Sequence, residues 1–209
     1  MPDRSDAARI AEFFAAPAPE VARRLIGARL LIGGVGGRIV ETEAYDGEDP
    51  ASHSFGGRTR RNGAMFGPPG HAYVYRSYGL HWCLNFVCSE EGHGAAVLIR
   101  ALEPTHGLAR MRQRRGLEDI RLLCAGPGRL AQALAIDLRL NGAFLGAAPF
   151  ALSLPAPDAP PPEVDAGPRI GISKAVDRPW RFAARGSRFL SRPMRAAGTL
   201  AESAAPRER

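Results

Sequence analysis

The first residues of the chain have the apolar spacing of amphipathic helices. In SDAARIAEFF (5–14), apolar side chains recur at helical spacing after two residues of the capping type. In PEVARRLIG (19–27), Pro19 suits a first helical position and Gly27 suits a terminator. The pattern therefore predicts two short helices at the start of the fold.

From residue 28 the pattern changes to that of β-strands. The segment ARLLIGGVGGRIVETEAY (28–45) combines β-branched residues with glycines, which predicts two strands joined by a turn at 33–37. Side chains alternate along a strand, so one face is expected to carry Ile39, Glu41, Glu43 and Tyr45. Glu43 and Tyr45 then line the same surface.

The segment AYVYRSYGLHWCLNFVC predicts a hairpin with strands at 72–75 and 80–88. Tyr78 lies near its tip, where a side chain cannot pack into the core of its own sheet. The segment AAVLIRALEP (95–104) predicts a further strand, which carries Arg100 toward its end. The hairpin with Tyr78 and the strand with Arg100 thus follow one another in the sequence.

The second half of the chain mixes helices, loops and short strands. Residues 106–116 and 117–136 have helical spacing interrupted at glycines, and four arginines form a basic face. Residues 155–168 are so rich in proline that we expect a surface loop, and 194–209 should be a frayed tail. The segments PRIGISKAV and PWRFAARG predict two closing strands.

These elements occur in separate runs without regular βαβ alternation, which indicates an α+β fold. A chain of 209 residues can fill one core and is short for two. We therefore expect residues 1–209 to form a single domain. It should contain a curved, mainly antiparallel β-sheet, flanking helices and a protruding β-hairpin.

Charge and cysteine usage narrow the choice of partner and compartment. The net charge of +7 favours a polyanionic partner. An Arg-rich genome composition is the competing explanation, because the chain has a single lysine, Lys174. Three cysteines without C-x-x-C spacing indicate neither a disulfide framework nor a zinc ribbon. With no signal peptide and no membrane span in view, we expect a soluble cytoplasmic protein.

The acidic stretch ETEAYDGEDPASH (41–53) allows two interpretations. Asp46, Glu48 and Asp49 lie among turn residues, and a solvated loop is the simpler explanation for them. Glu43 lies within a β-branched strand, where a carboxylate costs desolvation unless it has a task. Glu43 is therefore the candidate for catalysis.

Aromatic and basic side chains gather in the same half of the sequence. Every tyrosine of the chain lies there, namely Tyr45, Tyr73, Tyr75 and Tyr78. Strand packing would explain the first three. The surrounding arginines are Arg58, Arg60, Arg61 and Arg76. Interleaved aromatic and basic residues are typical of surfaces that hold unstacked nucleotides, so we expect a nucleic-acid partner.

Several other chemistries lack their motifs. The sequence has neither H-E-x-x-H nor the H-x-E and P-C-x-x-C pair of zinc deaminases, so no metal is expected. It also lacks a phosphate-binding G-x-x-x-x-G-K-[ST] loop and a G-x-S-x-G elbow. We expect no cofactor.

Longer strings carry a family resemblance. The segments RIVETEAYDGEDPASHSFGGRTRRN, MFGPPGHAYVYRSYGLHWCLNFVC, VLIRALEP and CAGPGRLAQALAI resemble the alkyladenine (3-methyladenine) DNA glycosylase family, over roughly residues 20–190. The resemblance implies an enzyme of base-excision repair that flips a damaged purine nucleotide out of duplex DNA and hydrolyses its glycosidic bond. Members of the family differ in accepting only cationic methylpurines or also neutral hypoxanthine and etheno adducts.

The resemblance also implies roles for single residues. Glu43 matches the carboxylate that activates water, and Arg100 matches a partner that helps hold that water. Tyr78 matches the wedge that enters the vacated space in the duplex. Residues that match the pocket around the flipped base are Tyr45, His53, Tyr75, Asn85 and the backbone of Ile170. We expect Arg58, Arg60, Arg61 and Arg76 to contact the DNA backbone.

The physics of the reaction agrees with these roles. A carboxylate near an oxocarbenium-like sugar offers charge stabilisation and general-base help to water. A lyase would need an amine, which only Lys174 or the N-terminus could provide, so we expect a monofunctional hydrolase. We also expect it to be a monomer associated with the nucleoid. A non-catalytic nucleic-acid-binding module and a hydrolase of free nucleosides are the alternatives.

Overall fold

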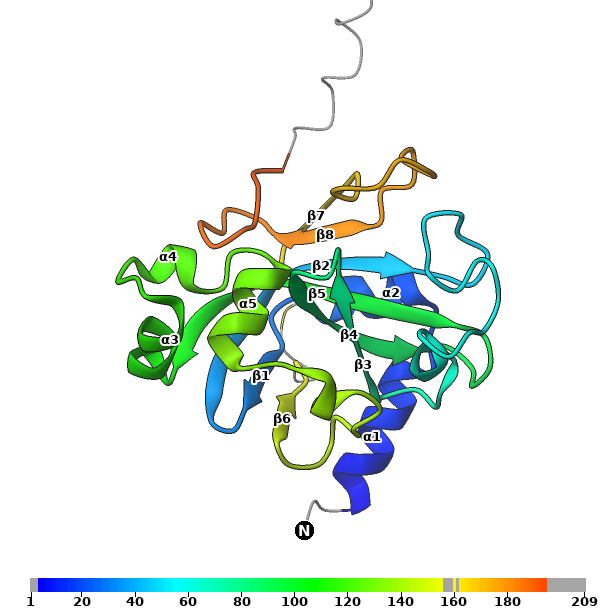
Figure 1. Ribbon diagram of the computed structural model, residues 1–209, viewed down its shortest axis with the longest axis horizontal. Coiled ribbons are helices and arrows are strands. Elements are labelled where there is room, and N and C mark those ends of the chain that lie inside the picture. The colour runs from blue at the N-terminus through cyan, green and yellow to red at the C-terminus, as the bar shows by residue number, and fades with distance from the viewer. Residues whose placement is uncertain (1–3, 156–159, 161, 195–209) are drawn as a thin grey trace, which may run out of the picture.

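In the part of the chain that the computed structural model describes, eight strands form one curled sheet, and every pairing between them is antiparallel (Figure 1). Along the main path the order is β3-β4-β5-β2-β1-β6, and β8 pairs with both β2 and β7. The strands are β1 (Arg29–Ile32), β2 (Val35–Tyr45), β3 (Ala72–Ser77), β4 (His81–Cys88), β5 (Ala95–His106), β6 (Phe150–Ser153), β7 (Val164–Gly167) and β8 (Arg181–Ala184). The structure describes residues 4–155, 160 and 162–194.

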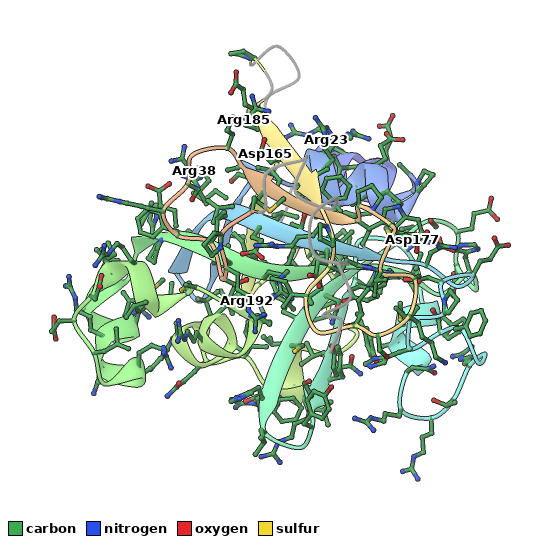
Figure 2. All side chains as sticks on the ribbon, turned by 90° about the horizontal axis from the view of Figure 1, so that it is seen from above. Arg23, Arg38, Asp165, Asp177, Arg185 and Arg192 are labelled. Atoms are coloured by element: carbon green, nitrogen blue, oxygen red, sulfur yellow. The ribbon has the colours of Figure 1, made fainter. Side chains whose placement is uncertain are left out.

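The helices flank this sheet, which confirms the predicted α+β fold. They are α1 (Arg4–Phe14), α2 (Ala18–Arg24), α3 (Leu108–Arg115), α4 (Ile120–Leu123) and α5 (Pro127–Leu134), with 3₁₀ turns η1 (Gly63–Phe66) and η2 (Leu138–Leu140). The β3–β4 hairpin projects away from the other strands, as predicted (Figure 2). Its first strand continues to Ser77, two residues beyond the expected end.

The main core lies between the sheet and the helices. Phe14 of α1 meets Phe86 of β4 edge to face, with ring centroids 5.8 Å apart. The Thr42 hydroxyl of β2 donates a hydrogen bond to the Ala22 carbonyl of α2 over 2.8 Å. These contacts attach the N-terminal helices to the strands that carry the site.

Strand β2 occupies the centre of the sheet. One of its edges pairs with β5 over nearly its full length. Its other edge is shared, since β1 pairs with residues 35–38 and β8 pairs with residues 41–43. Glu41 and Glu43 therefore have strands on both sides, and both residues are fully buried.

A β-bulge in β2 makes the predicted assignment of side chains to its two faces partly wrong. The pairing with β5 is irregular between Ile39 and Thr42. Ile39 belongs to the main core together with Ala44, whereas Val40 packs in a separate cluster with Phe189. Ile39 therefore does not share a face with the two glutamates, because the bulge reverses the alternation that the sequence predicts.

The closing strands also differ from the prediction. The segment 168–176 is a loop rather than a strand, and β7 instead lies within the predicted surface loop, at 164–167. The backbone N–H of Ile170 donates to a side chain of β2 instead of to a neighbouring strand. Strand β8 agrees with the prediction from PWRFAARG. The predictions for the proline-rich residues 156–159 and 161 and for the tail at 195–209 lie outside the described residues.

Candidate active site

A cavity of about 760 Å³ opens beside β2, β4 and β5. This volume is within the range of small-molecule sites. Of the predicted site residues, eight line it: Tyr45, His53, Arg61, Tyr75, Tyr78, Asn85, Arg100 and Ile170. Glu43 lies behind the lining, while Arg58, Arg60 and Arg76 are exposed elsewhere on the surface.

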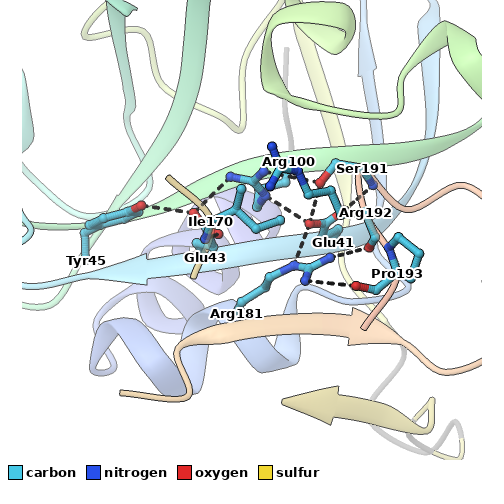
Figure 3. A network of polar contacts seen from close by, with 9 residues as sticks. All are labelled: Glu41, Glu43, Tyr45, Arg100, Ile170, Arg181, Ser191, Arg192 and Pro193. Carbon is cyan, nitrogen blue, oxygen red and sulfur yellow. Dashed lines mark hydrogen bonds and ion pairs between the residues drawn. The ribbon is translucent and has the colours of Figure 1, made fainter. Parts of the chain in front are cut away.

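Three donors hold the carboxylate of Glu43 (Figure 3). Its Oε1 accepts the Ile170 backbone N–H over 2.7 Å. Its Oε2 accepts the Tyr45 hydroxyl over 2.9 Å and Arg100 Nη1 over 3.0 Å. All three partners line the cavity, so the carboxylate lies directly beneath its surface.

The environment of Glu43 opposes ionisation on balance. Desolvation raises the pKa of this carboxyl, and the charge of Glu41 adds to that effect. Arg100, the Ile170 N–H and the Tyr45 hydroxyl act in the opposite direction without cancelling it. A raised pKa is what a carboxylate needs to accept a proton from water near neutral pH.

The neighbouring Glu41 has more partners that stabilise its negative charge than Glu43 has. It accepts hydrogen bonds from Arg100 Nε over 2.9 Å and from Arg181 Nε over 2.8 Å. The Ser191 backbone N–H and hydroxyl also donate to it, over 2.6 and 2.7 Å. Burial alone would raise the pKa of Glu41, but these guanidinium groups and hydrogen bonds outweigh it and lower the pKa.

Aromatic rings form one side of the cavity. The His53 ring meets Tyr75 edge to face with centroids 4.5 Å apart, and its Nδ1 lies 3.1 Å from the Tyr73 hydroxyl. Tyr73 and Tyr75 are stacked at 5.5 Å. Desolvation raises the pKa of Tyr73 to about 12, and desolvation together with nearby Arg61 lowers the pKa of His53. Neutral, flat surfaces of this kind suit the faces of a purine.

Asp49 contradicts its prediction as a solvated turn residue. Its side chain is fully buried and paired with Arg169, whose Nη2 donates to Oδ1 over 3.0 Å. Arg169 Nη1 also donates to the Ala44 carbonyl over 2.9 Å. The same guanidinium lies over the Tyr45 ring, 4.7 Å from its centroid. The acidic exit loop of β2 thus anchors an arginine against the cavity wall.

The hairpin tip presents Tyr78 to its surroundings. Its side chain is 91% exposed, and its φ of 49° lies in the left-handed region that non-glycine residues rarely adopt. Gly79 also has positive φ, and the Leu80 N–H closes the turn on the Ser77 carbonyl over 2.9 Å. Arg61, beneath the hairpin, donates to the Arg76 carbonyl over 3.1 Å. A large apolar ring is therefore held away from the protein beside the cavity.

Several residues of the site were not predicted from sequence. Met65, Tyr73, Cys83, Leu98 and Lys174 also line the cavity. The arginines Arg169 and Arg181 support it from behind, and both pair with acidic residues more than a hundred positions away. Their only signal in the sequence is an arginine within a predicted strand, which is too common to identify them.

Among the residues that the structure describes, no group of three or more histidine, cysteine, aspartate or glutamate side chains is arranged to hold a metal ion. Within the same residues, none of the helices has the length and apolar character needed to cross a bilayer.

Comparisons with known proteins agree with the sequence resemblance. A family model described as "Methylpurine-DNA glycosylase" matches residues 12–188. A protein of Nitrosospira multiformis is 64% identical over 182 residues, which cover 87% of this chain and 93% of that protein. A protein of Rhodopseudomonas palustris is 64% identical over 181 residues, covering 87% and 86%. One of Rhizobium meliloti is 60% identical over 181 residues, covering 87% and 95%. All three are named "Putative 3-methyladenine DNA glycosylase". The chain belongs to the methylpurine-DNA glycosylase family, as its sequence motifs predict.

Proposed function

We propose that this DNA-repair glycosylase flips a damaged purine nucleotide into the cavity and hydrolyses its N-glycosidic bond with a water activated by Glu43. The products would be a free base and an abasic site. The observation that carries this proposal is the position of Glu43, a fully buried carboxylate with a raised pKa behind a cavity that is lined by aromatic rings.

The hydrogen bonds of Glu43 leave room for a water molecule. Oε2 already accepts from Tyr45 and Arg100, whereas Oε1 accepts only from the Ile170 N–H among the described residues. A carboxylate oxygen has about two acceptor sites, so Oε1 retains one. A water entering between Ile170 and Arg100 would bind there. Its oxygen would bond to C1′ as the C1′–N bond breaks, while Glu43 stabilises the cationic sugar and takes the proton of the water. A cationic methylpurine would leave as the neutral base, and hypoxanthine would leave as an anion that takes up a proton from solvent.

The rest of the cavity offers surfaces suited to the purine base of that nucleotide. Tyr45, His53 and Tyr75 would face the purine ring, and Asn85, with its Nδ2 donating to the Tyr73 carbonyl over 3.0 Å, would restrict the base edge. Flipping costs roughly a few kcal/mol of unstacking. Insertion of the exposed Tyr78 into the vacated space would offset part of that cost.

The basic residues give the protein its affinity for the duplex in this proposal. Arg58, Arg60, Arg61 and Arg76 surround the hairpin and the loop that precedes η1, and they would contact phosphates. Each neutralised phosphate releases counterions, so binding should weaken steeply as salt rises.

The experiment compares wild-type protein with Glu43→Gln on duplexes that carry one hypoxanthine or one cationic methylpurine. Alkali cleaves the abasic product, and gel electrophoresis gives the single-turnover rate. We expect Glu43→Gln to lose at least about 100-fold in rate while it retains binding, because general-base catalysis contributes about that much. The exposed Glu48→Gln is the matched control and should excise like wild type.

Two outcomes would reject the proposal. Equal rates for wild type and Glu43→Gln would remove Glu43 from the mechanism. Binding without excision of either base by wild-type protein would favour a non-catalytic nucleic-acid-binding module. A third arm with free nucleosides tests the remaining alternative, for which the wedge and the basic residues would have no use.

A further inference from the structure

Glu41 is the most heavily hydrogen-bonded carboxylate of the site and yet has no place on the cavity surface. It is fully buried, and its two oxygens receive four hydrogen bonds, from Arg100, Arg181 and both donors of Ser191. It can therefore act on the reaction only through a neighbouring residue. Figure 3 shows Arg100 lying between Glu41 and Glu43.

Arg100 is shared between the two carboxylates. Its Nε donates to Glu41 over 2.9 Å and its Nη1 donates to Glu43 over 3.0 Å. Its Nη2 donates to the Ser191 hydroxyl over 3.2 Å. Glu41 thus fixes the orientation of the guanidinium and offsets part of its positive charge. An arginine that paired with Glu43 alone would make that carboxylate a weak base.

We infer that Glu41 is a positioning residue that holds Arg100 and shares its charge, so that Glu43 keeps the basicity needed to activate water. Arg181 completes the arrangement by balancing Glu41 from the side of β8. With Glu43 ionised, the cluster then contains two carboxylates and two guanidinium groups. This inference rests on the proposed function of Glu43.

The other groups that face Glu43 do not replace Glu41 in this role. On β2 these are Glu41 and the Tyr45 hydroxyl, and on β5 the group is Arg100. Cys83 faces it from β4, and the loop after β7 contributes the Ile170 N–H. Arg181 of β8 lies opposite Glu43 in the strand pairing. Of these, Glu41 is the group whose negative charge raises the pKa of Glu43.

The experiment uses two charge-removing variants of the full chain, Glu41→Gln and Arg181→Gln. Glutamine can still accept from Arg100 at position 41 or donate to Glu41 at position 181, so the geometry is largely kept. Glu41→Gln leaves the cluster with an excess positive charge, which favours ionisation of Glu43. Arg181→Gln leaves an excess negative charge, which opposes it. Glu41→Gln loses two buried ion pairs, with Arg100 and with Arg181, and Arg181→Gln loses one, so both should be less stable than wild type.

Single-turnover excision is measured against pH for wild type and both variants. The acid limb, which is the fall in excision rate on the acidic side of the pH–rate profile, should move to lower pH in Glu41→Gln. It should move to higher pH in Arg181→Gln. A purely structural role would change stability in the same direction in both variants and would leave the acid limb in place. Unchanged limbs, or shifts in the same direction, would overturn the inference.

The design separates this inference from the proposed function. If wild type excises and Glu43→Gln does not, Glu43 is the base whatever the two variants do. Circular dichroism shows whether each variant folds. If one does not, the direction in which the acid limb shifts in the other variant still tests the role of Glu41. An acid limb that moves opposite to the expected direction in that remaining variant rejects the role of Glu41.

Discussion

Removal of the Asp49 charge tests how firmly the cavity wall is anchored. Asp49 and Arg169 have fully buried side chains, and Arg169 also lies against the Tyr45 ring. In an Asp49→Asn variant the guanidinium would stay buried without its counter-ion. Its Nε has no hydrogen-bond partner among the described residues even in the native protein. Removing one partner of a buried pair costs about 3–5 kcal/mol.

This cost is a large share of the roughly 5–15 kcal/mol that stabilises a typical domain. For a chain of this size 1 kcal/mol corresponds to about 2–4 °C, so the unfolding midpoint should fall by roughly 6–20 °C. Thermal and urea unfolding followed by circular dichroism measure the effect. Glu20→Gln is the matched control, because its pair with Arg24 has side chains that are 55% and 47% exposed, and it should lose less than about 1 kcal/mol. Equal losses in the two variants would refute the reasoning.

Two further predictions concern catalysis and DNA contact. Because burial raises the pKa of Glu43 above 4.5 despite Arg100, excision should slow as the pH falls through that raised pKa. Single-turnover rates from about pH 4 to about pH 8 measure it, and an acid limb below pH 4.5 would contradict it. Tyr78→Ala should weaken lesion binding and excision, while the unfolding free energy changes by less than about 0.5 kcal/mol, because the ring is 91% exposed. Gel-shift and urea-unfolding measurements test this, and a variant that unfolds at low temperature would exclude the wedge.

The elements with local signals were predicted well. Helices α1 and α2, the β3–β4 hairpin and β5 all lie close to their predicted bounds. Strand β6 was missed, since it has only four residues and its partner β1 lies more than a hundred positions earlier. The segment 168–176 has the apolar residues of a strand, but its Ile170 backbone N–H donates to the side chain of Glu43 instead of to a neighbouring strand. A strand is defined by its partners, which a local pattern does not contain.

The candidate site was likewise predicted where residues have a local signal and missed where their partners are distant in sequence. Tyr45, Tyr75, Tyr78, His53 and Glu43 stand out by residue type and by their family motif, and they do surround or support one cavity. Asp49 looked like a turn residue because DGEDP has the composition of a solvated loop. Its burial depends on Arg169, 120 positions away. Ion pairs of such separation are set by the fold, so local sequence reasoning cannot assign them.

The bulge in β2 explains how one strand serves both the core and the site. Before it, Val35 and Ile39, at odd positions, belong to the main core; after it, Ala44, at an even position, does so. A shift of one residue sends every following side chain to the opposite face. Without the bulge, Glu41 and Glu43 would continue on the face of Ile39 and lie in an apolar core with no cationic partner. With the bulge they face Arg100 and Arg181, so both buried carboxylates have cationic partners.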